Sequence, residues 1–134
     1  NFFIDNIFFD EKFFMYLENV DLCLRAKKNS GQLFIIMNSK IHHLGAKAVD
    51  DRYSEEIELS RNWHWMWSKL YFNKKHRGIF ISSIFGLISL IGNFFKYFIY
   101  LVTFSKKRNI YKMRVLGIFN SLLGRQSWYR PELN

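Results

Sequence analysis

One long uncharged segment constrains the fold of this chain more than any other feature of its sequence. Residues 78–95 are 18 consecutive residues without a charge, and after Lys96 the apolar character resumes and continues to Phe104. Hydrophobic segments of this length are typical of helices that contact a membrane. The sequence therefore predicts a membrane-associated helix over residues 78–104.

Small and polar residues recur along one face of this expected helix. Their intervals of four and three residues place them in a single stripe, with Ile, Leu, Phe and Val on the opposite side. A helix in the membrane plane would turn the stripe to water and its apolar side to the acyl chains. A spanning helix would use the stripe for close packing, and a buried core helix is the third alternative. The stripe consists of Ser82, Gly86, Ser89, Asn93, Lys96, Tyr100 and Thr103.

The positive charge of the chain gathers around the same segment. Residues 1–60 hold 10 acidic and 7 basic residues, a net charge of −3, whereas residues 61–134 hold 1 acidic and 13 basic residues, a net charge of +12. Cationic clusters beside an apolar block are typical of contact with anionic lipid head groups, and the block argues against a nucleic-acid partner. The cations expected to face an anionic membrane surface are Lys74, Lys75, Arg77, Lys96, Lys106, Lys107 and Arg108.

An aromatic segment precedes the apolar block. Residues 61–72 place aromatic and apolar side chains at helical spacing, and Trp and Tyr favour the head-group level of a membrane. We therefore expect Trp63 and Trp67 to face the membrane, with a core-packing face as an equally supported alternative.

The N-terminal part has a different pattern. Residues 18–28 predict a helix with a buried stripe of Leu17, Val20 and Leu24, and Asp21 and Arg25 stand four apart, so they should pair on its surface. Two extended pieces, residues 33–37 and 40–45, are expected to follow. The single cysteine of the chain excludes an internal disulfide framework.

Two carboxylates share one turn of this expected helix. Glu18 and Asp21 stand three residues apart, and such a pair can hold a cation or supply a catalytic base. The alternative, which composition alone favours, is an ordinary solvated helix face.

The run FDEKFFMYLENVDLCLR at residues 9–25, followed by Ile-His-His-Leu-Gly at residues 41–45, resembles the catalytic domain of family-2 glycosyltransferases in its C-terminal half. The resemblance is greatest to rhamnosyltransferase-type enzymes of bacterial surface polysaccharides. It implies an α/β fold of the GT-A type in residues 1–60, followed by membrane-associated helices in residues 61–134. It also implies a nucleotide-sugar donor, a lipid-linked glycan acceptor, a divalent cation (Mg²⁺ or Mn²⁺), and a location on the cytoplasmic face of the bacterial inner membrane, peripheral or with one membrane helix.

The same resemblance assigns roles to particular residues. The family motif Glu-Asp-x-Asp has its expected base at the position of Asn19, and an amide cannot accept the proton. Glu18 is therefore the first candidate for a substitute base, with Asp21 oriented toward Arg25. His43 falls where some members place a histidine near the metal and the diphosphate.

The family's donor-binding half, with its Asp-x-Asp motif, has no counterpart here, and the chain begins with Asn1 rather than Met. We expect the C-terminal part of a membrane-associated sugar transferase, inactive by itself. A non-catalytic membrane-binding remnant is the alternative.

Overall fold

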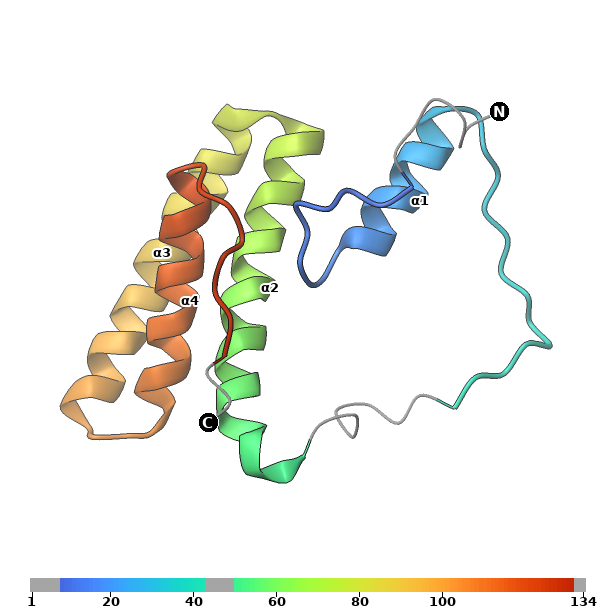
Figure 1. Ribbon diagram of the computed structural model, residues 1–134. Helices are drawn as coiled ribbons and strands as arrows, with labels where there is room; N and C mark the ends of the chain where they lie inside the picture. Colours follow the sequence, from blue (N-terminus) through green and yellow to red (C-terminus); the bar gives the residue numbers. More distant parts are fainter. Residues whose placement is uncertain (1–7, 43–49, 132–134) are drawn as a thin grey trace.

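The computed structural model describes residues 8–42 and 50–131, and within these ranges the chain forms four α-helices (Figure 1). The first lies apart from the other three in the sequence. A 3-10 turn, Asp51–Tyr53, leads into the second helix. The helices are α1 (Glu18–Lys28), α2 (Ser54–Arg77), α3 (Ile79–Val102) and α4 (Lys107–Leu122).

The last three helices run antiparallel to their neighbours in sequence and pack into a three-helix bundle in which each contacts the other two. After α4 the chain turns at Gly124, whose φ of +70° is a left-handed conformation, and the C-terminal segment returns along α2 (Figure 1). Helix α1 and the loop before it lie beside α2 on its other side. The bundle is therefore flanked by the C-terminal segment and by α1 with its preceding loop, both attached to α2.

The expected α/β fold of the GT-A type is wrong, because the described residues contain no strand. Residues 33–37, predicted to be a strand, are irregular with highly exposed side chains, and Phe34 is 79% exposed. A strand needs a neighbour for its backbone groups, and the described part of the chain offers none. The second expected strand is irregular up to His42, and its remainder lies outside the described residues.

Two helix predictions are confirmed. Residues 18–28 form α1 with the expected bounds, and the helix expected over residues 78–104 is α3. At the end of α1, Ser30 adopts the left-handed backbone, with a φ of +62°. The domain boundary expected at residue 60 falls inside α2.

Helices α2 and α4 approach each other closely at Gly117. A Cβ atom on this glycine would collide with the backbone carbonyl of Trp63, so any side chain would push the two helices apart. The core around this contact is small, and its fully buried side chains include Trp63, His64, Ser68 and Ile118. Bundle packing therefore depends on backbone proximity as much as on apolar volume.

Helix α3 packs against α2 and α4 through its stripe of small and polar residues. Ser82 is buried and donates a hydrogen bond to the Leu70 carbonyl at 3.0 Å. A Cβ on Gly86 would lie 2.7 Å from side-chain atoms of Leu70 and Leu122. The stripe is thus the packing face of α3, and the apolar side is left facing outward.

We predict that Gly117→Ala destabilises the bundle while Gly92→Ala does not. The new methyl group at position 117 meets backbone, and overpacking of this kind costs roughly 1–3 kcal/mol. Position 92 has open space around its Cβ, so alanine there should be neutral or stabilise α3. Thermal unfolding followed by circular dichroism measures both, and equal melting temperatures for wild type and Gly117→Ala would contradict the close approach.

Candidate functional site

The outer face of α3 is a continuous exposed apolar surface, and we call it the apolar face. Its members lie opposite the packed stripe and extend from the first turn of the helix to the last. Among the described helices, α3 is the one that is long and apolar enough to cross a membrane, and most of it is not buried within the protein. The apolar face consists of Ile79, Phe80, Ile81, Ile84, Phe85, Leu87, Ile88, Ile91, Phe94, Phe95, Phe98, Ile99, Leu101 and Val102.

Exposed apolar surface of this size has a cost in water. Soluble monomers rarely expose contiguous apolar patches larger than a few hundred Å². Burial of apolar area contributes about 25 cal/mol per Å², so covering this face would release substantial free energy. Covering the outer side of α3 with lipid or protein would therefore be energetically favourable.

Basic residues lie at both ends of α3, as the sequence predicts. Lys74 and Arg77 are exposed near the end of α2, just before the first turn of α3. Lys106 and Lys107 are exposed just after its last turn, and the Lys107 ammonium lies 6.0 Å from the centre of the Tyr100 ring. Because the two turns lie at opposite ends of the bundle, cations flank the apolar face at both ends (Figure 1).

Two other expected membrane-facing cations point elsewhere or are shielded. The Lys96 ammonium lies 5.7 Å from the centre of the Tyr111 ring, so it leans toward α4. Arg108 is half-buried at the start of α4. The contact of Lys96 with Tyr111 contributes to the packing of α3 against α4.

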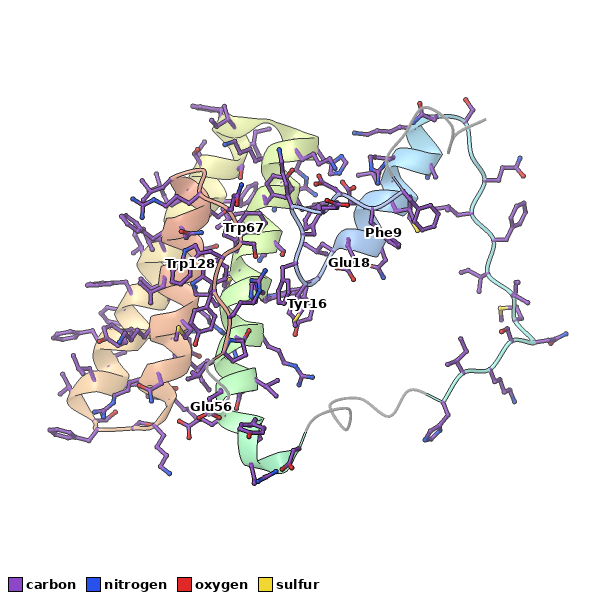
Figure 2. All side chains as sticks on the ribbon, viewed as in Figure 1. Phe9, Tyr16, Glu18, Glu56, Trp67 and Trp128 are labelled. Carbon is purple, nitrogen blue, oxygen red and sulfur yellow. The ribbon has the colours of Figure 1, made fainter. Side chains whose placement is uncertain are left out.

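Trp63 and Trp67 do not face outward, in contrast to the prediction. Their side chains are 1% and 3% exposed and form the centre of the core between α2, α4 and the C-terminal segment. Figure 2 shows Trp67 on α2 and Trp128 on the returning C-terminal segment. The core-packing alternative holds because Gly117 brings α4 directly over Trp63.

Asp21 forms the centre of a buried ionic cluster between α1 and α2. One carboxylate oxygen, Oδ1, accepts a hydrogen bond from His76 Nε2 at 2.7 Å and lies 2.8 Å from Lys75 Nζ. The other, Oδ2, accepts from Arg25 Nε at 2.8 Å and from Lys75 Nζ at 2.9 Å. Lys75 also bonds to Asp10 at 2.7 Å, so this cation faces α1 rather than a membrane, contrary to the prediction.

The predicted pair of Asp21 and Arg25 is therefore present, but it is not on the surface. Asp21 is fully buried, whereas Val20, expected in the buried stripe of α1, is 44% exposed. Helix α1 attaches to the bundle through ions rather than through an apolar stripe, because the nearest part of α2 is its cationic end. Sequence patterning alone gives no sign of this arrangement.

The cluster keeps both aspartates ionised. Burial alone would raise the pKa of Asp21, but hydrogen bonds from Lys75, Arg25 and His76 outweigh it and hold the pKa below its usual range. Burial would also raise the pKa of Asp10. Hydrogen bonds from Lys75, the Lys12 backbone N–H and Tyr71 outweigh burial and lower this pKa. Burial and the Asp10 carboxylate raise the pKa of the Tyr71 hydroxyl. With both oxygens engaged by cations, Asp21 is not placed to act as a base or a metal ligand.

Glu18 differs from Asp21 in having an unengaged oxygen. Its Oε2 atom is buried and has no hydrogen-bond partner among the described residues. Tyr16 and Leu17, just before it, both adopt left-handed backbone, which is strained for residues other than glycine. The Ser68 hydroxyl holds this turn by donating to the Met15 carbonyl at 2.7 Å, and Figure 2 shows Tyr16 and Glu18 where α1 approaches α2.

The other expected site residues are not brought together. Asn19 is exposed, and its side-chain oxygen accepts a hydrogen bond from the Val20 backbone at 2.8 Å. His43 lies outside the described residues. Within the described ranges no group of three or more His, Cys, Asp or Glu side chains could hold a metal ion, so they do not form the expected Mg²⁺ or Mn²⁺ site.

His64 is a buried contact that sequence patterning does not single out. Its Nε2–H donates to the Tyr129 carbonyl at 2.8 Å, and Nδ1 accepts from the Ser127 hydroxyl at 2.8 Å. Burial lowers the pKa of His64, with the nearby Arg130 charge adding to the effect, so the ring is neutral. His64 therefore fastens the C-terminal segment to α2.

Comparison with known proteins finds no matching family model and no significantly similar curated protein or solved structure.

We predict that Asp21→Asn strongly destabilises the protein, while Asp50→Asn has little effect. Removing the buried anion breaks its ion pairs with Arg25 and Lys75 and leaves Lys75 paired with Asp10 alone, and breaking a buried pair in this way costs about 3–5 kcal/mol. Asp50 pairs with Arg52 on the surface, where both side chains are well exposed. Urea unfolding at pH 7 measures both variants.

The same cluster sets the response to acid. Because the folded-state pKa values of Asp10 and Asp21 are lowered, their stabilisation is complete above the ordinary value of 3.8 and is lost as pH falls through the lowered values. Wild-type stability should therefore fall below about pH 4, and Asp21→Asn should flatten that decline. If the free energy of unfolding of Asp21→Asn fell with pH as steeply as that of wild type, the role of the cluster would be contradicted.

Proposed function

We propose that the chain is a membrane-docking module that lies in the plane of an anionic membrane surface, with the apolar face of α3 inserted among the acyl chains. The observation that carries the proposal is the inverted packing of α3, with small and polar residues inward and apolar side chains outward. Lipid is the favoured occupant because the face is flanked by cations at both ends and contains no charge along its length.

The helices that pack against α3 favour docking in the membrane plane over a membrane-spanning α3. Helices α2 and α4 pack along it, so a spanning α3 would carry Arg61, Lys69, Lys112 and Arg114 to hydrocarbon depth. Each charged side chain at the centre of a bilayer costs roughly 2.5–3.5 kcal/mol even on the lowest scales. Only the in-plane arrangement leaves α2 and α4 in water while their apolar neighbour contacts lipid.

The charge of the C-terminal part supports the cytoplasmic face of a bacterial inner membrane as the location. Anionic lipids on that leaflet attract basic segments with about 1 kcal/mol per Lys or Arg near the surface. Residues 61–134 carry a net charge of +12. Binding should therefore weaken with added salt, because screening acts on exposed charges first.

We predict that Ile88→Glu combined with Ile91→Glu abolishes binding to anionic vesicles without unfolding the chain. Both side chains belong to the apolar face, at 62% and 69% exposure, so the folded protein tolerates the change while insertion into lipid does not. Vesicle flotation measures binding, and circular dichroism checks folding.

The matched control is Phe34→Glu combined with Ile36→Glu, which adds the same charge at side chains that are 79% and 72% exposed outside α3. The control should retain binding. Equal loss of binding in both double variants would contradict α3 as the docking element.

A second candidate function is participation in sugar transfer from a nucleotide-sugar donor to a lipid-linked glycan acceptor, as part of a longer enzyme. The sequence resemblance at residues 9–25 supports it, together with the buried unpartnered Oε2 of Glu18 behind a strained turn. A carboxylate with a free oxygen suits a general base, which contributes roughly 10²–10⁴-fold. The base would deprotonate the acceptor hydroxyl, and docking on the membrane would present that acceptor.

We predict that, in the enzyme containing this chain, Glu18→Gln lowers kcat for sugar transfer by about 10²-fold or more without loss of stability. Glutamine keeps the shape of the side chain and removes its ionisable group. Thermal unfolding and a transfer assay with a lipid-linked acceptor are measured on the same preparation. Full activity in Glu18→Gln would refute its role as base while leaving membrane docking intact.

A further inference from the structure

A pocket lined by cations lies where the loop before α1, helix α2, the end of α4 and the C-terminal segment meet, and we call it the basic pocket. Its volume is about 630 Å³, within the roughly 300–1,000 Å³ typical of small-molecule sites. Four cationic side chains line it, against one carboxylate, Glu11. The cations are Lys12, Lys74, Arg125 and Arg130.

The basic pocket opens on the side of the bundle opposite the outer face of α3. On α2 it is lined by Trp67, Tyr71 and Lys74, and none of the described residues that line it belongs to α3. In Figure 1, α3 lies behind α4, whereas the C-terminal segment runs in front of α2. A membrane docked on α3 would not reach the pocket, so its ligand comes from the aqueous side.

The protein does not neutralise these cations. Within the described residues no ion pair joins Lys12, Lys74 or Arg125 to a carboxylate, and the Arg130 guanidinium donates to two backbone carbonyls. Four cations against Glu11 leave an excess of three positive charges. The C-terminal end of α4, which lies beside the pocket, offsets about half a charge. The pocket therefore favours a ligand with about two or three negative charges.

The walls of the pocket are held by contacts that leave its cations free. Trp67 and Tyr71 stack at 5.0 Å between ring centres and form one wall. The Tyr71 hydroxyl donates to Asp10, whose carboxylate is paired with Lys75 rather than with a cation of the pocket. Trp67 Nε1–H donates to the Arg125 carbonyl at 3.0 Å, which fixes the backbone from which that guanidinium projects. A ligand would find the site largely formed, at a low cost in ordering.

The cations reach the pocket from segments that are far apart in the sequence. Lys74 Nζ of α2 lies 3.9 Å from the position that a Cβ atom on Gly124 would take, so this ammonium is beside the residue that precedes Arg125. The Arg130 guanidinium lies 3.4 Å from the centre of the Phe14 ring, in the loop before α1. The fold thus brings three separate basic segments to one cavity, although each of them alone would be an ordinary solvated charge.

We propose that the basic pocket binds a soluble oligophosphate, that is, a compound with two or three linked phosphoryl groups. Phosphate oxygens accept charge-assisted hydrogen bonds from both Lys and Arg. One phosphoryl group carries about 1.5–2 negative charges near pH 7, so linked groups are needed to match the excess in the pocket. This binding does not depend on the docking of α3. The chain would contact a membrane on one side of the bundle and a phosphorylated solute on the other.

The test measures binding of inorganic pyrophosphate to the full chain by titration calorimetry, with a neutral detergent covering the apolar face and without divalent cations. Wild type should bind pyrophosphate about tenfold more tightly than orthophosphate, at about 0.15 M salt to screen exposed charges. Lys12→Gln combined with Arg125→Gln should weaken binding about a hundredfold, because each charge-assisted hydrogen bond contributes about tenfold or more. Lys69→Gln combined with Lys112→Gln removes the same charge outside the pocket and should change the affinity less than about twofold.

Three outcomes would overturn the inference while membrane docking stands. The first is a wild type that does not bind pyrophosphate, and the second is an equal loss of affinity in both double variants. The third is citrate binding as tightly as pyrophosphate, because the pocket would then select charge and not phosphoryl groups. Circular dichroism checks folding. Lys74→Gln is the second pocket variant, with an expected loss of about tenfold if the double variant unfolds.

A second probe, methyl diphosphate, distinguishes an organic ester from free pyrophosphate. The volume of about 630 Å³ exceeds the space that a diphosphate group alone would fill, so the pocket has room for an organic substituent. We therefore expect methyl diphosphate and pyrophosphate to bind with similar affinity. Methyl diphosphate binding about tenfold more weakly would overturn the organic ester and leave free pyrophosphate as the ligand, because methylation removes one ionisable oxygen.

Discussion

The structure depends on the way α3 packs against its neighbours. Ser82 and Gly86 let the α3 backbone come close to α2 and α4, and the same rotation of the helix turns most of the large apolar side chains of α3 outward. In a soluble bundle the opposite rotation would bury those side chains, with a gain of about 1.5–3 kcal/mol for each. The observed packing is favourable when lipid, rather than protein, covers the apolar face.

The rest of the molecule compensates for an apolar helix that contributes little to the core. Trp63 and Ile118 fill the centre, Gly117 closes the distance between α2 and α4, and His64 fastens the C-terminal segment. Helix α1 attaches through the carboxylate of Asp21 instead of through an apolar stripe. Polar and close-packed contacts thus replace apolar burial, and the apolar surface remains available for the membrane.

Much of the helical architecture could be predicted from the sequence, because helix signals are local. The bounds of α1 and α3 follow from periodicity and from the length of the uncharged segment. The direction in which a side chain faces is not determined by the neighbouring sequence. Trp67 has the same amphipathic chemistry whether it faces lipid or core, and the contact of α4 with α2 decides between them.

The fold class and the ionic cluster could not be predicted from sequence patterns, because both depend on contacts between distant parts of the chain. Residues 33–37 have the composition of a buried strand, but a strand forms only beside another, and the described residues supply none. Asp21 was expected on a helix surface because its helix partner Arg25 is four residues away. Its burial depends on Lys75 and His76, more than 50 residues later in the chain.

The depth of three positions along α3 tests the central claim most directly. Phe80, Ile91 and Val102 are 11 residues apart, so they share one side of the helix, and all three are well exposed. Each would be replaced by cysteine in a Cys23→Ser background, spin-labelled, and measured for depth in anionic vesicles. In-plane docking predicts three similar, shallow depths. A label at position 91 about 15 Å deeper than those at 80 and 102, near the middle of the bilayer, would contradict the account.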